Sequence, residues 1–265
     1  MCPRVPARLL GQDGAARLVC HCLVLETARD GLILIDTGFG TADVEEPRRL
    51  PGTFRALVGA RLSRQETMLA QLEALGHHAT EVRHIVVTHL DLDHAGGLGD
   101  FPAATVHLHQ RELDVATAQA TVRDRLRYRA VQWAHGPSWR AYSERGDTWR
   151  GLPAIRKLEG LDADVALLPM HGHSRGHSAV LIGAGDQWLV HAGDAYFHRN
   201  SVSPGPSAPK VPVGLRMFEA QMRVDKAAHV ASVRALRELR AAHRDVAMFC
   251  AHDPVELEAM AAPAN

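Results

Sequence analysis

The sequence lacks the features that would assign it to a charged or membranous partner. Its 30 acidic and 30 basic side chains give a formal net charge of zero, so nothing attracts it in general to nucleic acid or an anionic membrane. Its hydrophobic stretches have the length of strands and are interrupted by charge, which predicts no transmembrane span. The first 18 residues contain no apolar run of signal-peptide length, and we therefore expect a cytoplasmic protein.

Cysteine is scarce: Cys2, Cys20, Cys22 and Cys250 are too few for a disulfide framework and do not have the spacing of a zinc ribbon. Cys20 and Cys22 would share one face of a strand, and we interpret both as small core residues. With 265 residues, 46% of them hydrophobic, the chain suits one large domain covering residues 1–265.

Histidine is abundant, with 17 residues, and it gathers with aspartate in residues 86–97 (VVTHLDLDHAGG). The apolar start of this stretch predicts a strand, after which His89, Asp91, Asp93 and His94 fall within six residues. A core would not collect two carboxylates beside two histidines, because a buried unpaired carboxylate is costly. Alternate residues of an extended end point to one side and can converge on a metal ion. The mixture of imidazole and carboxylate predicts a two-metal hydrolytic centre, and the alternative is a solvated turn with Asp93 as a helix N-cap.

The pattern around this stretch alternates between strands and helices. Residues 18–27 and 32–36 predict a hairpin, and residues 62–76 predict a helix that begins with a capping box from Ser63 to Glu66. This order argues for an α/β layer rather than an all-β fold. Further strands are expected at residues 105–109, 154–158, 165–168, 188–190 and 246–250, and helices at residues 111–120 and 218–243.

Residues 89–94 (HLDLDH) resemble the HxHxDH signature of the metallo-β-lactamase superfamily. Asp91 stands where most members have the second histidine. The resemblance covers residues 18–252 and is strongest to the acyl-homoserine lactonase and glyoxalase II-like branch. It implies an α/β fold of the four-layer αββα sandwich type.

The resemblance also implies a ligand in each later motif. His173 lies in a segment similar to the family's Gly-His-x-x-Gly-His, Asp194 matches the carboxylate that bridges the two metals, and His252 follows the last strand. The first metal would be held by His89, Asp91 and His173, the second by Asp93, His94 and His252, and Asp194 would bridge them. Three residues are expected to support the ligands from behind: Asp36, Thr88 and His177.

The implied chemistry is attack by a metal-bound hydroxide on the carbonyl of a lactone, ester or thioester, with Asp93 and Asp194 as catalytic carboxylates. Two divalent ions, three aspartates and a hydroxide sum to zero charge, where a histidine in place of Asp91 would leave one positive charge. We therefore expect the two metal ions to have lower Lewis acidity. Zinc is the expected metal, and the site should also accept iron or manganese. The lactonase branch has a tyrosine three residues after the bridging aspartate, but here that residue is Phe197. Tyr196 is the candidate for its role, and a buried core tyrosine is the alternative.

Three further segments allow two interpretations each. Residues 121–150, rich in arginine and aromatics, are either an insertion covering the substrate or a face packed onto the scaffold. The Pro-rich residues 200–214 form a loop or a lid, and residues 45–59 a loop at the rim of the site. His107 and His109 share a strand face, which suggests packing rather than a second metal site.

Two functions of other classes remain open: an iron-dependent oxidoreductase on the same fold, and a non-catalytic binding module. The expected partner is a small-molecule substrate, with no nucleic acid and no membrane. The oligomeric state, the exact substrate, the identity of the metal and the filling of both sites stay open.

Overall fold

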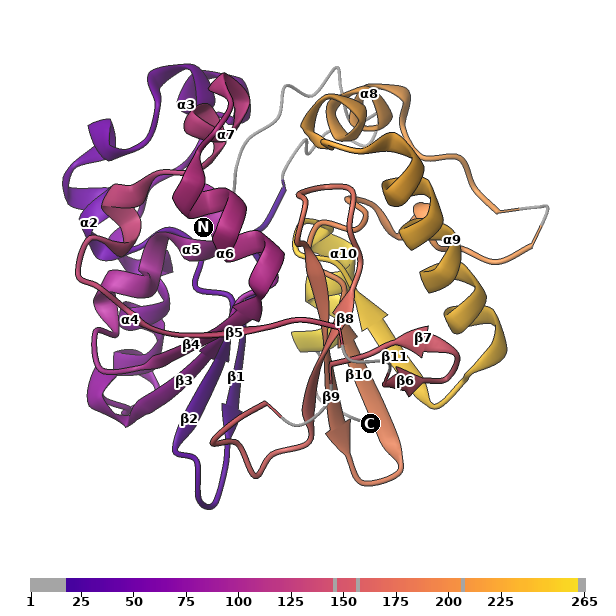
Figure 1. Ribbon diagram of the computed structural model, residues 1–265, viewed down its shortest axis with the longest axis horizontal. Helices are drawn as coiled ribbons and strands as arrows, with labels where there is room; N and C mark the ends of the chain where they lie inside the picture. The colour runs from indigo at the N-terminus through magenta and orange to yellow at the C-terminus, as the bar shows by residue number, and fades with distance from the viewer. Residues whose placement is uncertain (1–17, 145–146, 156–157, 206–207, 262–265) are drawn as a thin grey trace.

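The computed structural model describes residues 18–144, 147–155, 158–205 and 208–261, and within them it contains two sheets placed face to face (Figure 1). The first sheet has the order β1 (Leu23–Glu26), β2 (Leu32–Ile35), β3 (Val82–Val86), β4 (Thr105–His109) and β5 (Ser138–Tyr142). The second has the order β11 (Val246–Phe249), β10 (Gln187–His191), β9 (Ser178–Ala184) and β8 (Val165–Pro169). The strands β6 (Thr148–Trp149) and β7 (Leu152–Pro153) form a small separate ribbon.

Helices cover the outer faces of both sheets. Those of the first half are α2 (Thr41–Glu45), α3 (Gly52–Val58), α4 (Met68–Ala74), α5 (Leu92–Ala95), α6 (Gln110–Ala118) and α7 (Val122–Arg127), and those of the second half are α8 (Val213–Met222), α9 (Lys226–Ala242) and α10 (Pro254–Ala261). Short 3-10 turns connect them: η1 (Pro47–Arg49), η2 (Arg64–Glu66), η3 (Ala79–Glu81), η4 (Gly96–Asp100), η5 (Ala130–Trp133) and η6 (Arg199–Ser201). Among the described residues, no helix is both long and apolar enough to cross a membrane.

The alternation of side chains along the strands produces the layers. In β2, Leu32 and Leu34 pack toward the helices of the first half, whereas Ile33 and Ile35 pack toward the second sheet. In β9, Val180 faces the first sheet and Leu181 faces the core shared with α9. Because both faces of each sheet are covered, strands such as β2 (LILI) and β8 (VALLP) are apolar at every position. The predicted αββα sandwich is confirmed.

Most predicted elements are confirmed, and the differences have local causes. The expected long helix at 218–243 is two helices, because Asp225 caps α9 by accepting from the Ala228 N–H at 3.0 Å. The capping box at Ser63 is wrong: Thr67 accepts the Ala70 N–H and begins α4. Residues 45–59 hold η1 and α3 rather than a plain loop.

The predicted hairpin of β1 and β2 is confirmed, but its first strand is shorter than expected. Val19 and His21 donate their backbone N–H groups to His252 O at 3.2 Å and to Ala251 O at 2.8 Å. The segment before β1 therefore pairs with the chain that follows β11, and it joins the two halves of the molecule at the end of the sheets that carries the candidate ligands.

Glu112 on α6 ties together the loops at that end. It is fully buried, and its carboxylate accepts four hydrogen bonds, two on each oxygen. The donors are Leu90 N at 3.1 Å, Tyr128 Oη at 3.0 Å, Ser174 Oγ at 2.7 Å and Gly176 N at 3.0 Å. Since the donors come from three separate loops, Glu112 fixes the positions of these loops relative to one another.

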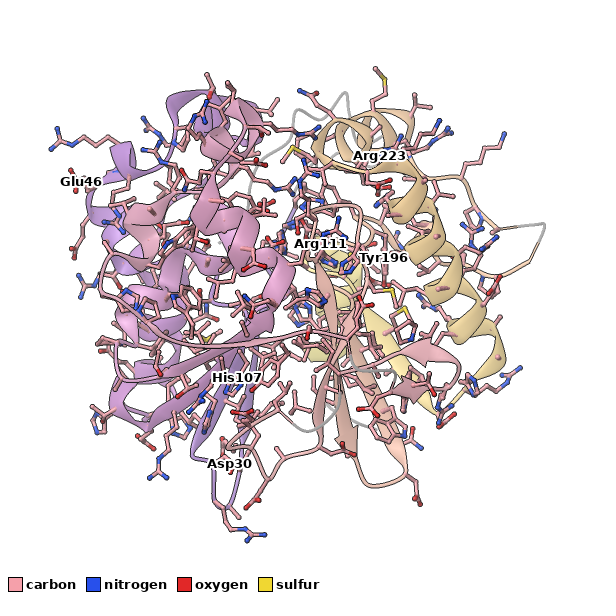
Figure 2. The ribbon with its side chains drawn as sticks, in the orientation of Figure 1. Asp30, Glu46, His107, Arg111, Tyr196 and Arg223 are labelled. Atoms are coloured by element: carbon pink, nitrogen blue, oxygen red, sulfur yellow. The ribbon has the colours of Figure 1, made fainter. Side chains whose placement is uncertain are left out.

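His107 on β4, labelled in Figure 2, is buried and belongs to a chain of polar groups that crosses three strands and reaches the surface at Glu159. The Glu159 N–H donates to Tyr142 Oη at 2.9 Å, and Tyr142 Oη lies 2.8 Å from His107 Nδ1. The other ring nitrogen of His107 lies 3.0 Å from His84 Nδ1. Burial, with smaller contributions from His84 and Arg140, lowers the pKa of His107 to about 3. The packing interpretation of His107 is thus confirmed.

Replacing Glu112 by alanine should lower the free energy of unfolding by about 3 to 5 kcal/mol, because it leaves buried N–H and O–H donors without an acceptor. Urea denaturation would measure the loss. The matched control is Asp114→Ala, which removes an exposed acid from the same helix and should change stability by about 0.5 kcal/mol or less. A loss no larger than that of the control would contradict this role of Glu112.

The pKa of His107 also predicts an acid-dependent loss of stability. Its folded pKa of about 3 lies below the ordinary 6.5, so the unfolded chain binds the proton more tightly. This contribution is fully present above pH 6.5 and is lost as the pH falls toward 3, by about 2 kcal/mol between pH 6.5 and 5. Urea denaturation at pH 7 and pH 5 should show a smaller loss in His107→Gln than in the unmodified chain, and equal losses would count against this assignment.

Candidate metal centre

The candidate ligands lie at one end of the two sheets, in the loops that follow four strands. The stretch after β3 supplies His89, Asp91, Asp93 and His94, and the loops after β8, β10 and β11 supply the other three residues: His173, Asp194 and His252. The structure brings all seven together as neighbouring groups around Asp194. Asp91 rather than Asp93 occupies the N-cap position of α5, and its side chain makes no capping bond.

The first group consists of His89, Asp91 and His173 with one oxygen of Asp194. Asp91 Oδ2 lies 3.3 Å from His89 Nε2 and 3.0 Å from His173 Nε2. Asp194 Oδ2 lies 3.2 Å from His173 Nε2 and 3.8 Å from His89 Nε2. Ligands about 2.0 to 2.2 Å from a tetrahedral zinc ion lie roughly 3.3 to 3.6 Å from one another, so these atoms have the spacing of one coordination shell.

The second group consists of His94, His252 and Asp93 with the other oxygen of Asp194. Asp194 Oδ1 lies 3.2 Å from His94 Nε2 and 2.9 Å from His252 Nε2. Asp93 is more loosely placed, with its oxygens 4.0 Å from His94 Nε2 and 3.8 Å from His252 Nε2. The two oxygens of Asp194 therefore face two different groups, as a bridging carboxylate requires.

Four buried atoms in these groups have no hydrogen-bond partner among the described residues: His173 Nδ1, which lies on the far side of its ring, and the three atoms His89 Nε2, His94 Nε2 and Asp194 Oδ1. Buried polar atoms are almost always satisfied, and unsatisfied ones mark an ion or water that belongs there. The last three point into the centre, so this donor set fits a pair of divalent ions.

The residues expected behind the ligands fix their orientation. Asp36, which has a positive φ of 55°, accepts from Thr88 N at 2.7 Å and Thr88 Oγ1 at 2.8 Å and lies 2.8 Å from His94 Nδ1. Thr88 Oγ1 in turn lies 2.9 Å from His89 Nδ1. With Nδ1 carrying the proton toward these oxygens, Nε2 presents its lone pair to the centre.

His177 supports the bridging residue Asp194 rather than the ring of a ligand histidine. Its Nδ1 donates to Met170 O at 2.8 Å, which leaves Nε2 free to accept the backbone N–H of Asp194 at 2.9 Å. His252 is held in a similar way, because its Nδ1 donates to Val19 O at 2.6 Å. The segment before β1 thus positions a residue from the opposite end of the chain.

The electric field at the centre favours positive charge. Burial lowers the pKa of His94 and of His252, but the carboxylates, Asp194 foremost, outweigh burial and raise both pKa values well above 6.5. Burial raises the pKa of Asp194, but the three histidines facing it outweigh burial and hold it well below its ordinary value. Burial and then Arg127 lower the pKa of His173 to about 3, so that this ring is neutral. Metal ions would supply the positive charge and replace the protons.

Arg127 on α7 is the residue of the centre that the sequence did not reveal. Its Nε and Nη2 donate to the two oxygens of Asp91 at 2.5 and 2.6 Å, and both side chains are 8% exposed. Its Nη1 donates to His173 O at 2.8 Å and Met222 O at 3.0 Å. The only signal was the arginine-rich composition of residues 121–150, which does not single out one arginine.

Tyr196 does not reach the centre, and its prediction as a catalytic residue is wrong. It is fully buried in the core between the second sheet and α9, and its hydroxyl donates to Glu256 at 3.2 Å (Figure 2). Phe197 points to the site instead, with its ring centre 5.7 Å from that of His173 and 4.9 Å from that of His252. The apolar ring of Phe197 therefore lies where the family resemblance implied a tyrosine hydroxyl.

Cys20 lies closer to the centre than its interpretation as a core residue implies. It packs against the cluster of Phe39, Leu50 and Leu92, but its Sγ also lies 3.7 Å from Asp93 Oδ2. Burial, with Asp93 second, raises the pKa of Cys20, so that the thiol remains protonated and donates to the carboxylate. Cys22 packs against the core as expected.

A cavity of about 310 Å³ opens onto both groups. Asp91, Asp93, Asp194 and His252 lie on its polar side. Its other walls are mostly apolar and come from α3, α7, α8 and the start of the described chain: Leu18, Pro51, Phe54, Leu57, Val58, Leu92, Leu126, Phe197, Phe218 and Met222. Residues 45–59 thus form part of the rim, as predicted.

Among the described residues of 121–150, only those of α7 line this cavity: Arg123, Leu126 and Arg127. The aromatic residues of the segment pack onto the scaffold: Tyr128 in the first-sheet core and Trp149 in the second. None of the described aromatic residues of this segment lines the cavity, so the alternative of a face packed onto the scaffold describes them. No described residue of 200–214 lines it either, and 206–207 lie outside the described residues.

A third cluster, His109, Glu144 and His171, lies apart from the centre. Glu144 Oε1 lies 3.6 Å from His109 Nε2 and 3.1 Å from His171 Nε2, so a carboxylate accompanies these two histidines. However, His109 Nδ1 accepts the Arg111 N–H at 3.1 Å, and burial lowers the pKa of His109. The neutral ring then carries its proton on Nε2, which has no hydrogen-bond partner among the described residues and offers no lone pair to a metal.

Comparison with known proteins agrees with this geometry. The model of the metallo-beta-lactamase superfamily matches residues 15–244. A probable metallo-hydrolase of Mycobacterium tuberculosis is 40% identical over 238 residues, which cover 89% of this chain and 75% of that protein. An N-acyl homoserine lactonase of Bacillus cereus is 25% identical over 175 residues, which cover 64% of this chain and 60% of that one.

Solved structures show the same fold at lower identity. An N-acyl homoserine lactone hydrolase with N-hexanoyl-L-homoserine bound at its catalytic metal centre has a TM-score of 0.69 at 20% identity, over 97% of this chain and 92% of that chain. A dizinc quorum-quenching lactonase has a TM-score of 0.59 at 18% identity, over 90% of this chain and 74% of that one. The chain therefore belongs to the metallo-beta-lactamase superfamily.

Proposed function

We propose that this protein is a hydrolase with two divalent metal ions, zinc first, that cleaves a lactone or another carboxylic ester or thioester. The observation that carries the proposal is the placement of Asp194, whose two oxygens face two separate ligand groups beside a mostly apolar cavity. Similarity to lactonases supports the reaction class, since two of them hold a homoserine product in their solved structures.

In this proposal the first ion is held by His89, Asp91 and His173, the second by Asp93, His94 and His252, and Asp194 bridges them. When bound, two such ions would lower the pKa of a water molecule to about 7 and polarise a carbonyl oxygen. Asp36, Thr88 and His177 hold the ligand atoms in position, because each is hydrogen-bonded to a ligand side chain or backbone.

Asp93 is the carboxylate best placed to move a proton. Its side chain is 14% exposed, against 8% for Asp91 and 4% for Asp194, and it lines the cavity. Its single hydrogen bond among the described residues is the weak one from the Cys20 thiol. A carboxylate that is accessible and loosely held can take a proton from the attacking water and pass it to the leaving oxygen or sulfur.

The cavity favours an uncharged substrate with an apolar chain. Arg123 and Arg127 line it, but both donate to protein acceptors: Arg123 to three carbonyl oxygens at the end of α8, Arg127 to Asp91 and two carbonyls. Apolar contact with walls such as Phe54, Leu126 and Phe218 would hold an acyl chain.

Replacing Asp194 by asparagine should remove the bridge, reducing the metal content below two ions per chain and turnover by about a hundredfold or more. Metal content would be measured by inductively coupled plasma mass spectrometry and turnover on a panel of small lactones, esters and thioesters. The control Asp186→Asn, at an exposed turn between β9 and β10, should change neither. Unchanged metal content and turnover in Asp194→Asn would refute the proposal.

The same measurement separates the other function classes. Protein that holds iron and consumes oxygen without hydrolysing any member of the panel would instead be an iron-dependent oxidoreductase. Protein that binds a small ligand equally well after chelation, with no turnover, would be a binding module.

Replacing Leu126 by glutamine should raise the KM for long-chain substrates by about tenfold while affecting short-chain ones little, because it removes apolar contact from the cavity wall. Steady-state kinetics on an acyl-chain series would test this. The matched control is Val122→Gln on the same helix, equally exposed at 64% against 62% for Leu126, but not in the cavity wall. Equal effects of the two substitutions at every chain length would contradict the assignment of this cavity.

A further inference from the structure

Asp91 and Arg127 form one tightly coupled unit inside the centre. Two parallel hydrogen bonds, 2.5 and 2.6 Å long, join the guanidinium to the two carboxylate oxygens. Such a bidentate pair fixes the orientation of the carboxylate as well as its charge state. Burial raises the pKa of Asp91, but Arg127 and the neighbouring histidines outweigh burial and hold it well below its ordinary value.

The pair leaves one side of the carboxylate free. Each oxygen accepts one bond from Arg127, and an oxygen of this kind has a second lone pair. Asp91 Oδ2 also lies 3.0 Å from His173 Nε2 and 3.3 Å from His89 Nε2, so it faces the first ligand group while it is held from behind. Arg127 further donates to His173 O, so one side chain positions two members of the group.

Arg127 also changes the charge of the centre. Two divalent ions, three aspartates and a hydroxide sum to zero, and the buried guanidinium adds one positive charge. A neutral histidine at position 91 with no arginine beside it would give the same total. The lower Lewis acidity expected from Asp91 alone is therefore offset within the site.

We propose that Asp91 and Arg127 together replace one neutral histidine ligand, with Arg127 as the positioning residue that orients Asp91 Oδ2 and cancels its charge. This inference rests on the proposed two-metal function. It assigns Arg127 to the metal centre rather than to substrate binding, because four of its five N–H groups donate to Asp91, His173 and Met222.

The test is a double-mutant cycle of Asp91→His, Arg127→Met and the two combined, with zinc affinity measured by competition with a chromogenic chelator. Asp91→His alone should weaken zinc binding at the first site by about tenfold or more, because it leaves a buried cation unpaired beside the ion. Adding Arg127→Met should restore two ions per chain and recover that loss. A purely structural arginine predicts the opposite sign, since its removal would add to the damage.

Arg123→Met is the control for the structural contacts of Arg127. Arg123 lies on the same helix and also donates to Met222 O, but it does not touch Asp91. The Arg123→Met substitution should leave zinc affinity unchanged. It should also lower the melting temperature of the metal-free protein less than Arg127→Met does. Zinc binding that is weaker in the double variant than in Asp91→His would overturn the inference while the two-metal function stands. Unmodified protein that binds no metal would overturn both.

Discussion

Buried negative charge at one end of the double sheet is the constraint on which the rest of this structure depends. Asp36, Asp91 and Asp194 are buried, and the histidines between them connect them. His89 contacts Asp91 and Asp194, and His94 contacts Asp36 and Asp194. Carboxylates in such surroundings need positive partners or they become protonated. The field of these carboxylates raises the pKa of two histidines and holds an arginine in place. It would also attract metal cations.

The fold meets this constraint by drawing each charged group from a different loop while the backbone stays rigid. Four strands end at the same edge, and each places one segment of ligands there. The loops between them are held by Glu112 and by the pairing of residues 19–21 with residues 251–252. Apolar layers on both faces of the sheets leave little freedom for the strand ends to move, so the spacing of the ligand atoms is set by the core.

How far the sequence predicts this site depends on how local each signal is. His89, Asp91, Asp93 and His94 lie in one short stretch after an apolar run, where the density of ionisable groups has no packing explanation. His173, Asp194 and His252 each follow a strand in an order that a family resemblance can match. The alternation of strands and helices predicts an α/β layer, and the αββα sandwich is implied by the family resemblance.

What the sequence does not predict is set by contacts between distant segments. Arg127 is one of several arginines in its segment, and its contact with Asp91 depends on how α7 crosses the site. Tyr196 is adjacent to Phe197, and only the direction of the turn after Asp194 decides which of them faces the cavity. The break between α8 and α9 depends on Gly172, whose carbonyl accepts the N–H groups of Val224 and Asp225.

The pairing of residues 19–21 with residues 251–252 also bears on how the molecule matures. The second ligand group needs His252, which is held by Val19, whereas the first is supplied by residues 89–173 and Asp194. During synthesis on the ribosome, the early ligands emerge long before residue 252 does. The first half-site can take shape on the nascent chain, but the second must wait for the last strand and for the return of the earliest segment to meet it.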